Sequence, residues 1–262
     1  MARKLCFITG SGSGNGRGMA LRFAELGYDI CLHHSGRDPE GAEKTRQEVL
    51  TKGVDCKILV EDLTESGAAQ RLFEKFRAEY DRLDIFINNS GITRRSPLMT
   101  VDEESINQVI NVNFRACYFC VAEAGKFMRE KGIRGSIATI ASNHHLVNFP
   151  RSFSIYASMK AAMVRFVKWA ALEFSPYGIR VNCIAPGYIL PLNREKELYQ
   201  RFEESLYPRI PLKRIVTPAE LADLAEFLAS PSGRSITGQT INVDGGDSLL
   251  NAPLASYHFD ED

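Results

Sequence analysis

Short, nearly continuous apolar runs recur along the chain and alternate with stretches in which apolar residues return every three or four positions. The first pattern is typical of strands buried on both faces, and the second of amphipathic helices. Seven runs qualify as strands: KLCFITG, DICLHH, DCKILVED, LDIFINN, GSIATIAS, GIRVNCIAPG and QTINVDGG. Stretches such as GRGMALRFAELG and DPEGAEKTRQEVLTKG, which lie between them, predict helices.

Strands that alternate with helices predict a parallel sheet with helices on both faces. We therefore expect an α/β fold with a doubly wound, Rossmann-like parallel sheet in three α/β/α layers, and ligands at the carboxyl ends of its strands. The sequence has no internal repeat and no linker, so residues 1–262 are expected to form a single domain. Two less regular segments are a candidate substrate lid at 188–215 and a surface tail at 251–262.

Charge and composition exclude several classes of function. The chain has 32 basic and 32 acidic side chains, so no general field attracts nucleic acid or an anionic membrane. No stretch approaches the roughly 18 apolar residues of a membrane span, and the start lacks the apolar segment of a signal peptide. We expect a cytoplasmic protein that acts on a small molecule, with neither nucleic acid nor membrane as a partner.

Cysteine and histidine give no metal site. The six cysteines lie in apolar stretches of a chain too long to depend on disulfides, so reduced core thiols are expected. Cys117 and Cys120 have C-x-x-C spacing but occupy a helical stretch, without a second such pair. The histidine doublets at 33–34 and 144–145 lack the partner that would complete a ligand set.

Five glycines alternate with other residues in TGSGSGNGRG, directly after the first predicted strand. The spacing G-x-x-x-G-x-G starts at Gly10 and at Gly12, and Thr9 at the strand end favours the first frame. Such a loop lets backbone N–H groups approach a pyrophosphate at a helix N-terminus, here expected near Gly16. A flexible loop without a ligand is the alternative. The loop residues predicted to contact a dinucleotide are Gly10, Ser13, Asn15 and Gly16.

YASMK places Tyr156 and Lys160 four positions apart, on one face of a predicted helix. A phenol has an ordinary pKa of about 10, so it relays protons near neutrality only beside a cation. Chance also supplies such pairs on helix surfaces, and the pair alone leaves that alternative open. Ser142 ends the preceding predicted strand and would reach the same crevice as the glycine loop. Its hydroxyl could donate to a substrate carbonyl, or simply cap the strand end.

The ordered set of motifs resembles the short-chain dehydrogenases/reductases from about Lys4 to Gly246, and NNSGITRRSPLM is similar to 3-oxoacyl-carrier-protein reductases. The other motifs in the set are Asp62-Leu63, Asn88 to Gly91, Val112-Asn113, Ser142, YASMK, Pro186-Gly187 and Val243 to Gly246. The resemblance implies a compact, dinucleotide-binding catalytic domain. It also implies an NAD(P)-dependent oxidoreductase that transfers hydride between the cofactor and a ketone or secondary alcohol.

The resemblance also implies residue roles. Tyr156 would be the general acid/base, Ser142 the carbonyl clamp, Lys160 the cation and ribose anchor, and Asn113 the holder of a water in a proton relay. Further predicted cofactor contacts are Asp62, Leu63, Asn89, Ser90, Gly91, Tyr156, Lys160, Pro186, Gly187 and Ile189. Asp62 would lie near the adenine, unless it caps a helix. The asparagine motif would lie near a ribose, or brace neighbouring loops.

The second strand bears on the form of the cofactor. NAD-binding folds of this type usually end that strand with an acidic residue, and NADP-binding ones replace it by a cation. The position falls near His34, and no carboxylate is there. Arg37 could meet a 2′-phosphate, assisted by a protonated His34 and by Ser35. Ser13, where many NADP-dependent relatives carry a basic residue, argues against this, but NADP is favoured over NAD, with no metal.

The substrate side is less specific. Ser142 and Tyr156 are 14 positions apart, one more than in many relatives, so the intervening loop is expected to bulge beside the substrate. The residues predicted to face the substrate are Asn143, His144, Phe149 and Tyr188. Aromatic and apolar residues of the candidate lid favour a nonpolar ketone.

Two other classes of function remain open at this point. One is a non-catalytic nucleotide-sensing protein, and the other a carbohydrate epimerase or dehydratase with the same Y-x-x-x-K. The helix containing KAAMVRFVKWAALEF is apolar around more than half of its circumference, more than packing on one sheet face requires. We therefore expect a homodimer or homotetramer that buries this helix.

Overall fold

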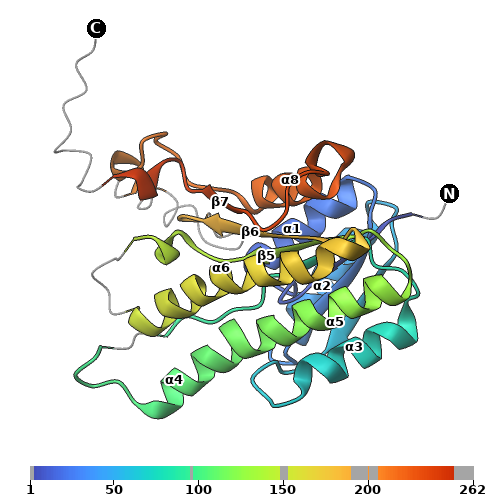
Figure 1. The fold of residues 1–262 in the computed structure, drawn as a ribbon, viewed down its shortest axis with the longest axis horizontal. Helices are drawn as coiled ribbons and strands as arrows, with labels where there is room; N and C mark the ends of the chain where they lie inside the picture. Colours follow the sequence, from blue (N-terminus) through green and yellow to red (C-terminus); the bar gives the residue numbers. More distant parts are fainter. Residues whose placement is uncertain (1–2, 95–96, 148–152, 190–199, 201–205, 251–262) are drawn as a thin grey trace, which may run out of the picture.

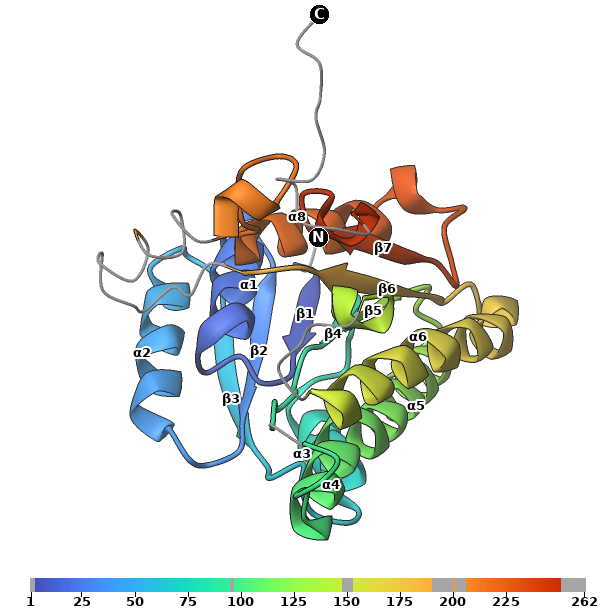
Figure 2. The same cartoon turned by 90° about the vertical axis from the view of Figure 1, so that its left-hand side faces the viewer.

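Seven parallel strands form one sheet in the order β3-β2-β1-β4-β5-β6-β7 (Figures 1 and 2). The computed structural model describes residues 3–94, 97–147, 153–189, 200 and 206–250. The strands are β1 Leu5–Ile8, β2 Asp29–His34, β3 Cys56–Val60, β4 Ile85–Asn88, β5 Ser136–Ile140, β6 Arg180–Pro186 and β7 Thr240–Val243. Each lies in one of the predicted apolar runs, and the doubly wound α/β fold is confirmed.

Helices cover both faces of this sheet. They are α1 Gly14–Glu25, α2 Pro39–Leu50, α3 Ala68–Glu79, α4 Glu103–Ile110, α5 Cys117–Glu130, α6 Ser154–Phe174 and α8 Pro218–Ala229. Helices α1, α2 and α8 pack on one face, and α3, α5 and α6 on the other. The three expected layers are therefore present.

Alternate residues of the strands fill two separate cores. Phe7 of β1 faces α3, where its ring stacks on Phe76 with 4.9 Å between centroids and lies 5.4 Å from the ring of Phe86. Cys6 and Ile8 on either side of it face the core beneath α1 and α8. Because side chains alternate across a strand, both faces of β1 are buried, and its register against its neighbours is firmly set.

Strand β1 lies at the point where the strand order reverses. The chain runs outward from β1 through β2 to β3 and then returns to β4 on the other side of β1. Phe7 pairs with Cys31 of β2 and with Phe86 of β4. The crevice at the carboxyl ends of β1 and β4 is therefore the ligand position expected for this type of sheet.

Helices α4 and α5 are joined without a break by a π-helical segment, Asn111–Ala116. The sequence predicts one regular helix through this region, and the structure differs from that prediction in the wider helical turns of the π segment. A π segment adds a residue to the helical turn and is frequent at functional sites. It carries Asn113 into the protein interior, where that side chain has no exposed surface.

Other predictions meet the structure at several places. All six cysteines are buried and free, as expected. Within the described ranges no helix has the length and apolar character to cross a membrane, and no three potential metal-ligating side chains gather. Most of the candidate lid, at 190–199 and 201–205, and the tail 251–262 lie outside the described residues.

Candidate active site

The glycine loop turns directly from β1 into α1. Gly10 has φ of +63°, a conformation that glycine adopts without strain. Helix α1 begins at Gly14, two residues before the predicted start, with Ser13 at its N-cap. A Cβ on Gly16 would lie 2.7 Å from Asn89 Nδ2 and would overlap the Gly10 carbonyl oxygen, so only glycine fits there. The free N–H groups of the first helical turn are thus presented at the crevice.

The asparagine motif after β4 holds this loop in place. Asn89 Nδ2 donates to the carbonyls of Thr9 and Gly10, at 2.9 and 3.1 Å. Thr9 Oγ1 in turn accepts from the backbone N–H groups of Asn89 and Ser90, at 3.0 Å each. These contacts correspond to the bracing alternative given for the motif, and they fix the position of Gly10.

A cavity of about 410 Å³ opens beside the loop and extends to the ends of β2 and β3. Twelve of the predicted cofactor residues line it: Gly10, Ser13, Asn15, Gly16, His34, Ser35, Arg37, Asp62, Leu63, Asn89, Ser90 and Gly91. Residues of the wall that were not predicted to contact the cofactor are Gly12, His33, Asp38, Thr64, Ile92 and Val112. The structure thus brings together residues up to 102 positions apart in the chain, Gly10 to Val112. Pro186 is not part of this wall and is buried at the end of β6.

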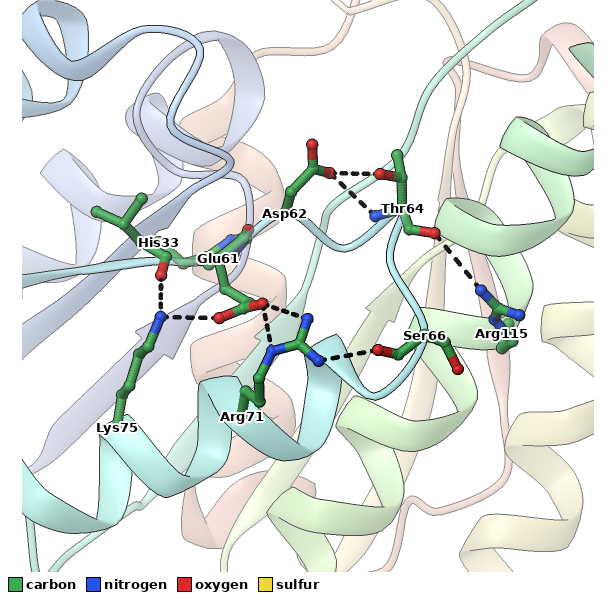
Figure 3. Close-up of polar contacts among 9 residues, drawn as sticks. His33, Glu61, Asp62, Thr64, Ser66, Arg71, Lys75 and Arg115 are labelled. Atoms are coloured by element: carbon green, nitrogen blue, oxygen red, sulfur yellow. Dashed lines mark hydrogen bonds and ion pairs between the residues drawn. The ribbon is translucent and has the colours of Figure 1, made fainter. Parts of the chain in front are cut away.

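Arg37 and Asp62, which the sequence treats separately, form an ion pair with 3.3 Å between Nη2 and Oδ2. Asp62 Oδ1 also accepts from the backbone N–H and the hydroxyl of Thr64, at 3.0 and 2.9 Å (Figure 3). Burial alone would raise the pKa of Asp62, but these hydrogen bonds and Arg37 lower it overall. Asp62 does not cap the following helix, because α3 begins at Ala68 with Gly67 at its N-cap.

His34 is neutral in the structure, which corrects the expectation of a protonated ring. Its Nδ1 accepts from the backbone N–H of Gly36 at 3.1 Å, and a nitrogen that accepts carries no proton. Partial burial lowers the pKa of His34 further, against the opposing charge of Asp38. Only a neutral donor at Nε2 is left for a ligand.

A second cavity, of about 250 Å³, lies at the carboxyl end of β5. It is lined by Thr93, Ser142, Asn143, His144, Phe153, Tyr156, Gly187, Tyr188 and Ile189. Ser142, which follows β5, and Tyr156, in the first turn of α6, therefore face the same space. Gly187 has no room for a side chain, since its Cβ would lie 2.7 Å from Asp244 Cβ.

Lys160 lies beneath Tyr156 and is only 4% exposed. Its Nζ lies 5.6 Å from the centroid of the Tyr156 ring and donates to the Ile140 carbonyl at 2.7 Å. A Cβ on Gly91 would lie 3.6 Å from the same Nζ, so the ammonium group adjoins the wall of the first cavity. The buried cation thus joins the two cavities.

Asn113 holds the chain that follows β4. Its Oδ1 accepts from the backbone N–H of Ile92, and its Nδ2 donates to the Ile92 carbonyl, both at 2.8 Å. Ile92 itself belongs to the wall of the first cavity. A polar residue within an apolar helix pattern thus has a positional role, and holding a relay water stays a prediction.

This donor set fits a dinucleotide. The helix N-terminus and the glycines allow close approach of a pyrophosphate, and the buried cation lies where the two cavities adjoin. A family model described as enoyl-(acyl carrier protein) reductase matches residues 10–248.

The chain belongs to the short-chain dehydrogenase/reductase family. As a member it is an NAD(P)-dependent oxidoreductase that transfers hydride between the cofactor and a ketone or secondary alcohol. This disfavours both the nucleotide-sensing and the epimerase alternatives.

Individual relatives are similar over almost their whole length. The 3-oxoacyl-(acyl-carrier-protein) reductase FabG of Staphylococcus aureus is 32% identical over 244 residues, 93% of this chain and 97% of the relative. The Chlamydia muridarum protein of that name is 34% identical over 248 residues, 94% and 98% of the two chains. The crystal structure of acetoin dehydrogenase from Enterobacter cloacae superposes with a TM-score of 0.85, at 31% identity and with 95% and 97% coverage.

Two predicted substrate residues, Asn143 and His144, line the second cavity and have different neighbours. The His144 ring meets the Tyr156 ring edge-on, 5.6 Å between centroids, and burial lowers the pKa of His144. Asn143 lines the cavity, but its Nδ2 donates to Asp247 Oδ2 at 2.9 Å. Burial and the charge of Asp244 raise the pKa of Asp247. Phe149 lies outside the described residues.

Two residues of the second cavity are missed by the sequence analysis. Thr93 follows the asparagine motif closely, and this position after a strand end was a signal that could have found it. Phe153 precedes α6 and has no signal of its own in the sequence. His33 of the first cavity was weighed only as a metal ligand.

Proposed function

We propose that Tyr156 is the general acid/base of this oxidoreductase, with Ser142 as the donor to the carbonyl oxygen and Lys160 as the adjacent cation. The observation that carries the proposal is the shared cavity of Ser142 and Tyr156, beneath which a buried ammonium group reaches the glycine-loop cavity. When bound, the nicotinamide supplies or accepts the hydride.

The work of the protein in the reductive direction is to stabilise charge and deliver a proton. Negative charge develops on the carbonyl oxygen, and the Ser142 and Tyr156 hydroxyls are the donors available to it. Lys160 favours the phenolate that remains after Tyr156 has given its proton. Asn113 keeps Ile92, and with it the wall between cofactor and substrate, in position.

Tyr156→Phe tests the assignment. It removes the proton donor and leaves the ring, so turnover should fall by about 10²–10⁴-fold, the usual contribution of a general acid. Purified protein is mixed with NADPH or NADH and a ketone panel, and the nicotinamide absorbance is followed.

The control is Tyr177→Phe, at a half-exposed tyrosine that packs on Arg129 and lines neither cavity. Its turnover should equal that of the wild type. Unchanged turnover in Tyr156→Phe would refute the catalytic role.

NADP(H) is the cofactor form we propose. No carboxylate stands at the end of β2, and the next one, Asp38, is occupied in capping α2, where it accepts from the Gly41 N–H at 2.9 Å. Arg37, with 64% of its side chain exposed, is the cation at this end of the cavity. Its pair with Asp62 is exposed and weak, so a 2′-phosphate can compete for the guanidinium.

The proposed substrate is a ketone or secondary alcohol with an apolar body. Phe153, Tyr188 and Ile189 supply the apolar surface, and the polar groups gather at Ser142 and Tyr156. The panel should include a 3-oxoacyl thioester and acetoin, because relatives are named for these compounds.

Self-association through α5 and α6 is proposed as well. The outer face of these helices leaves Tyr118, Trp169 and Leu172 exposed by 45%, 54% and 65%. An apolar groove of about 440 Å³ runs between the two helices, and a second copy of this chain is the proposed partner.

A further inference from the structure

His33 of β2 connects the glycine loop to the end of β3 through its imidazole ring. The side chain is buried, 2% exposed. The backbone N–H of Gly10 lies 3.0 Å from its Nδ1, and the carbonyl of Glu61 lies 2.9 Å from its Nε2. Gly10 donates, so Nδ1 must be unprotonated; the carbonyl only accepts, so Nε2 must carry the proton. The two contacts together define one neutral tautomer.

The Glu61 end of this connection is held rigidly. The Glu61 carboxylate is 9% exposed and pairs with Arg71 and Lys75 of α3, each at 2.7 Å (Figure 3). Lys75 also donates to the Val60 carbonyl at 2.6 Å. These contacts fix the backbone that presents the Glu61 carbonyl to His33. Residues of α3 and of the end of β3 thus fix the position of the imidazole ring, and the ring in turn holds the Gly10 N–H of the loop.

At the loop end, Asn89 holds the carbonyls of Thr9 and Gly10, and the Ser11 N–H donates to the His33 carbonyl at 2.9 Å, while His33 Nδ1 is the acceptor for the Gly10 N–H. Glycines recur through the loop and lose more conformational freedom on ordering than any other residue. A ligand that had to order this loop would bind more weakly by the cost of that ordering. A hydrogen bond to the N–H of Gly10, the first glycine, removes part of this freedom in advance.

We propose that His33 is a positioning residue for the dinucleotide: its neutral imidazole holds the Gly10 N–H and so presets the loop that receives the pyrophosphate. The inference rests on the dinucleotide site of the proposed function, and it assigns His33 no contact with the reacting atoms.

The surroundings of the ring favour the neutral form. Burial lowers the pKa of His33 to about 4; the positive charge of Lys75, and that of His34 whenever its ring is protonated, act in the same direction, whereas Glu61 acts in the opposite direction. These titratable groups lie on the same strand as His33, on α3 and in the loop after β3. A protonated ring would have no acceptor for Gly10.

Two conservative variants separate the two ends of the connection. His33→Asn places an amide oxygen near the position of Nδ1, within reach of Gly10, whereas His33→Gln reaches toward Glu61 and leaves Gly10 without an acceptor. Binding of NADPH is measured by calorimetry at pH 7. We expect His33→Asn to bind within about threefold of the wild type, and His33→Gln at least about tenfold more weakly, which corresponds to about 1.4 kcal/mol.

Cys31→Ala is the matched control, because Cys31 is a buried residue on the same face of the same strand, packed in the core with α3 and outside the cavity wall. It should lower the melting temperature without weakening NADPH binding. In His33→Gln the KM for NADPH should rise while kcat at saturating cofactor stays near the wild-type value, a split that general destabilisation does not produce.

Equal affinity in His33→Asn and His33→Gln would overturn the proposal, as would a loss confined to His33→Asn. The ¹⁵N spectrum of the wild-type imidazole gives a decision independent of the variants: a protonated Nδ1 at pH 7 would also overturn it. Wild-type protein that binds neither NADPH nor NADH would instead refute the dinucleotide site itself, so the two failures are distinguishable.

Discussion

Three polar side chains in the site hold backbone groups of the protein. Asn89 holds the glycine loop, Asn113 holds Ile92, and His33 joins Gly10 to Glu61. Each satisfies backbone atoms in loops that cannot use the hydrogen bonds of the sheet. A buried polar group without such a partner would cost about 1–3 kcal/mol of stability. Single hydrogen bonds from these three side chains therefore hold the backbone of the site in its conformation.

Stability should depend on pH through His33. Its folded pKa of about 4 lies below the ordinary value of about 6.5, so the unfolded chain binds more protons between these limits. The stabilisation is fully present above pH 6.5 and is lost as the pH falls toward 4, by up to about 3 kcal/mol. Urea unfolding of the wild type and His33→Gln from pH 7.5 to 4.5 measures this. Their difference should shrink with acid, and parallel curves would contradict the prediction.

Arg37→Ala should weaken NADPH far more than NADH, by about tenfold in the ratio of the two Kd values, because only NADPH carries the phosphate that the guanidinium can bind. Calorimetry with both cofactors measures the ratio. Arg46→Ala removes another arginine, paired with Glu43 on α2 away from the cavity, and should leave the ratio unchanged. Equal losses for NADPH and NADH in Arg37→Ala would refute the phosphate contact.

Single residues differ in how far the sequence reveals them. Tyr156 and Lys160 are found because their relation is local, four positions on one helix. His33 and Asn113 depend on partners 28 and 21 positions away, and those partners are backbone atoms without any signature of residue type. The pairing of Arg37 with Asp62 also joins two strand ends and could not be read from either segment alone.

At the scale of elements, the junction of β1 with α1 is the most constrained part of the site. Helix α1 begins at Gly14, and its first turn passes so close to the Gly10 carbonyl that Gly16 has no space for a Cβ. Helix α1 also packs on α2 and α8, so a shift of its first turn would be opposed by the core on that face.

Gly16→Ala should therefore disturb both stability and dinucleotide binding. The added methyl group would overlap Gly10 and Asn89, and overpacking of this kind costs about 1–3 kcal/mol. Gly53→Ala is the control: its φ of +75° costs an alanine about 1 kcal/mol, but open space surrounds it and the cavity is distant. Urea unfolding and NADPH calorimetry measure both variants. A Gly16→Ala protein that binds NADPH like Gly53→Ala would contradict the close approach.

The seven strands are predicted well because central parallel strands are almost wholly apolar, and each is a short run between turn residues. The π-helical segment is not predicted. A π-helix has about one more residue per turn than an α-helix. The segment Asn111–Ala116 is too short for the spacing of its apolar residues to distinguish the two. Within the segment Asn113 accepts from the backbone N–H of Ile92, a tertiary contact that the local pattern does not contain.

The face of α5 and α6 concerns the whole molecule. The Tyr118 and Phe166 rings stack across the two helices with 4.4 Å between centroids, and Phe114 lies 6.3 Å from Phe166. Beside them Trp169 and Leu172 stay more than half exposed. The sequence indicates this excess of apolar surface on α6 from its circumference, but α5 as the other side of the groove appears only once the helices are packed.

Trp169→Glu should dissociate the assembly if this face joins two copies of the chain. A glutamate there would place a charge in a buried apolar contact, which costs several kcal/mol per copy and acts twice in a symmetric dimer. Sedimentation velocity at micromolar concentration should show a dimer or tetramer for the wild type and a lower oligomer for the variant. Leu26→Glu, at the exposed end of α1 beneath the opposite face of the sheet, should leave the wild-type state unchanged. A monomeric wild type, or a Trp169→Glu protein that sediments like it, would show that this face is not the interface.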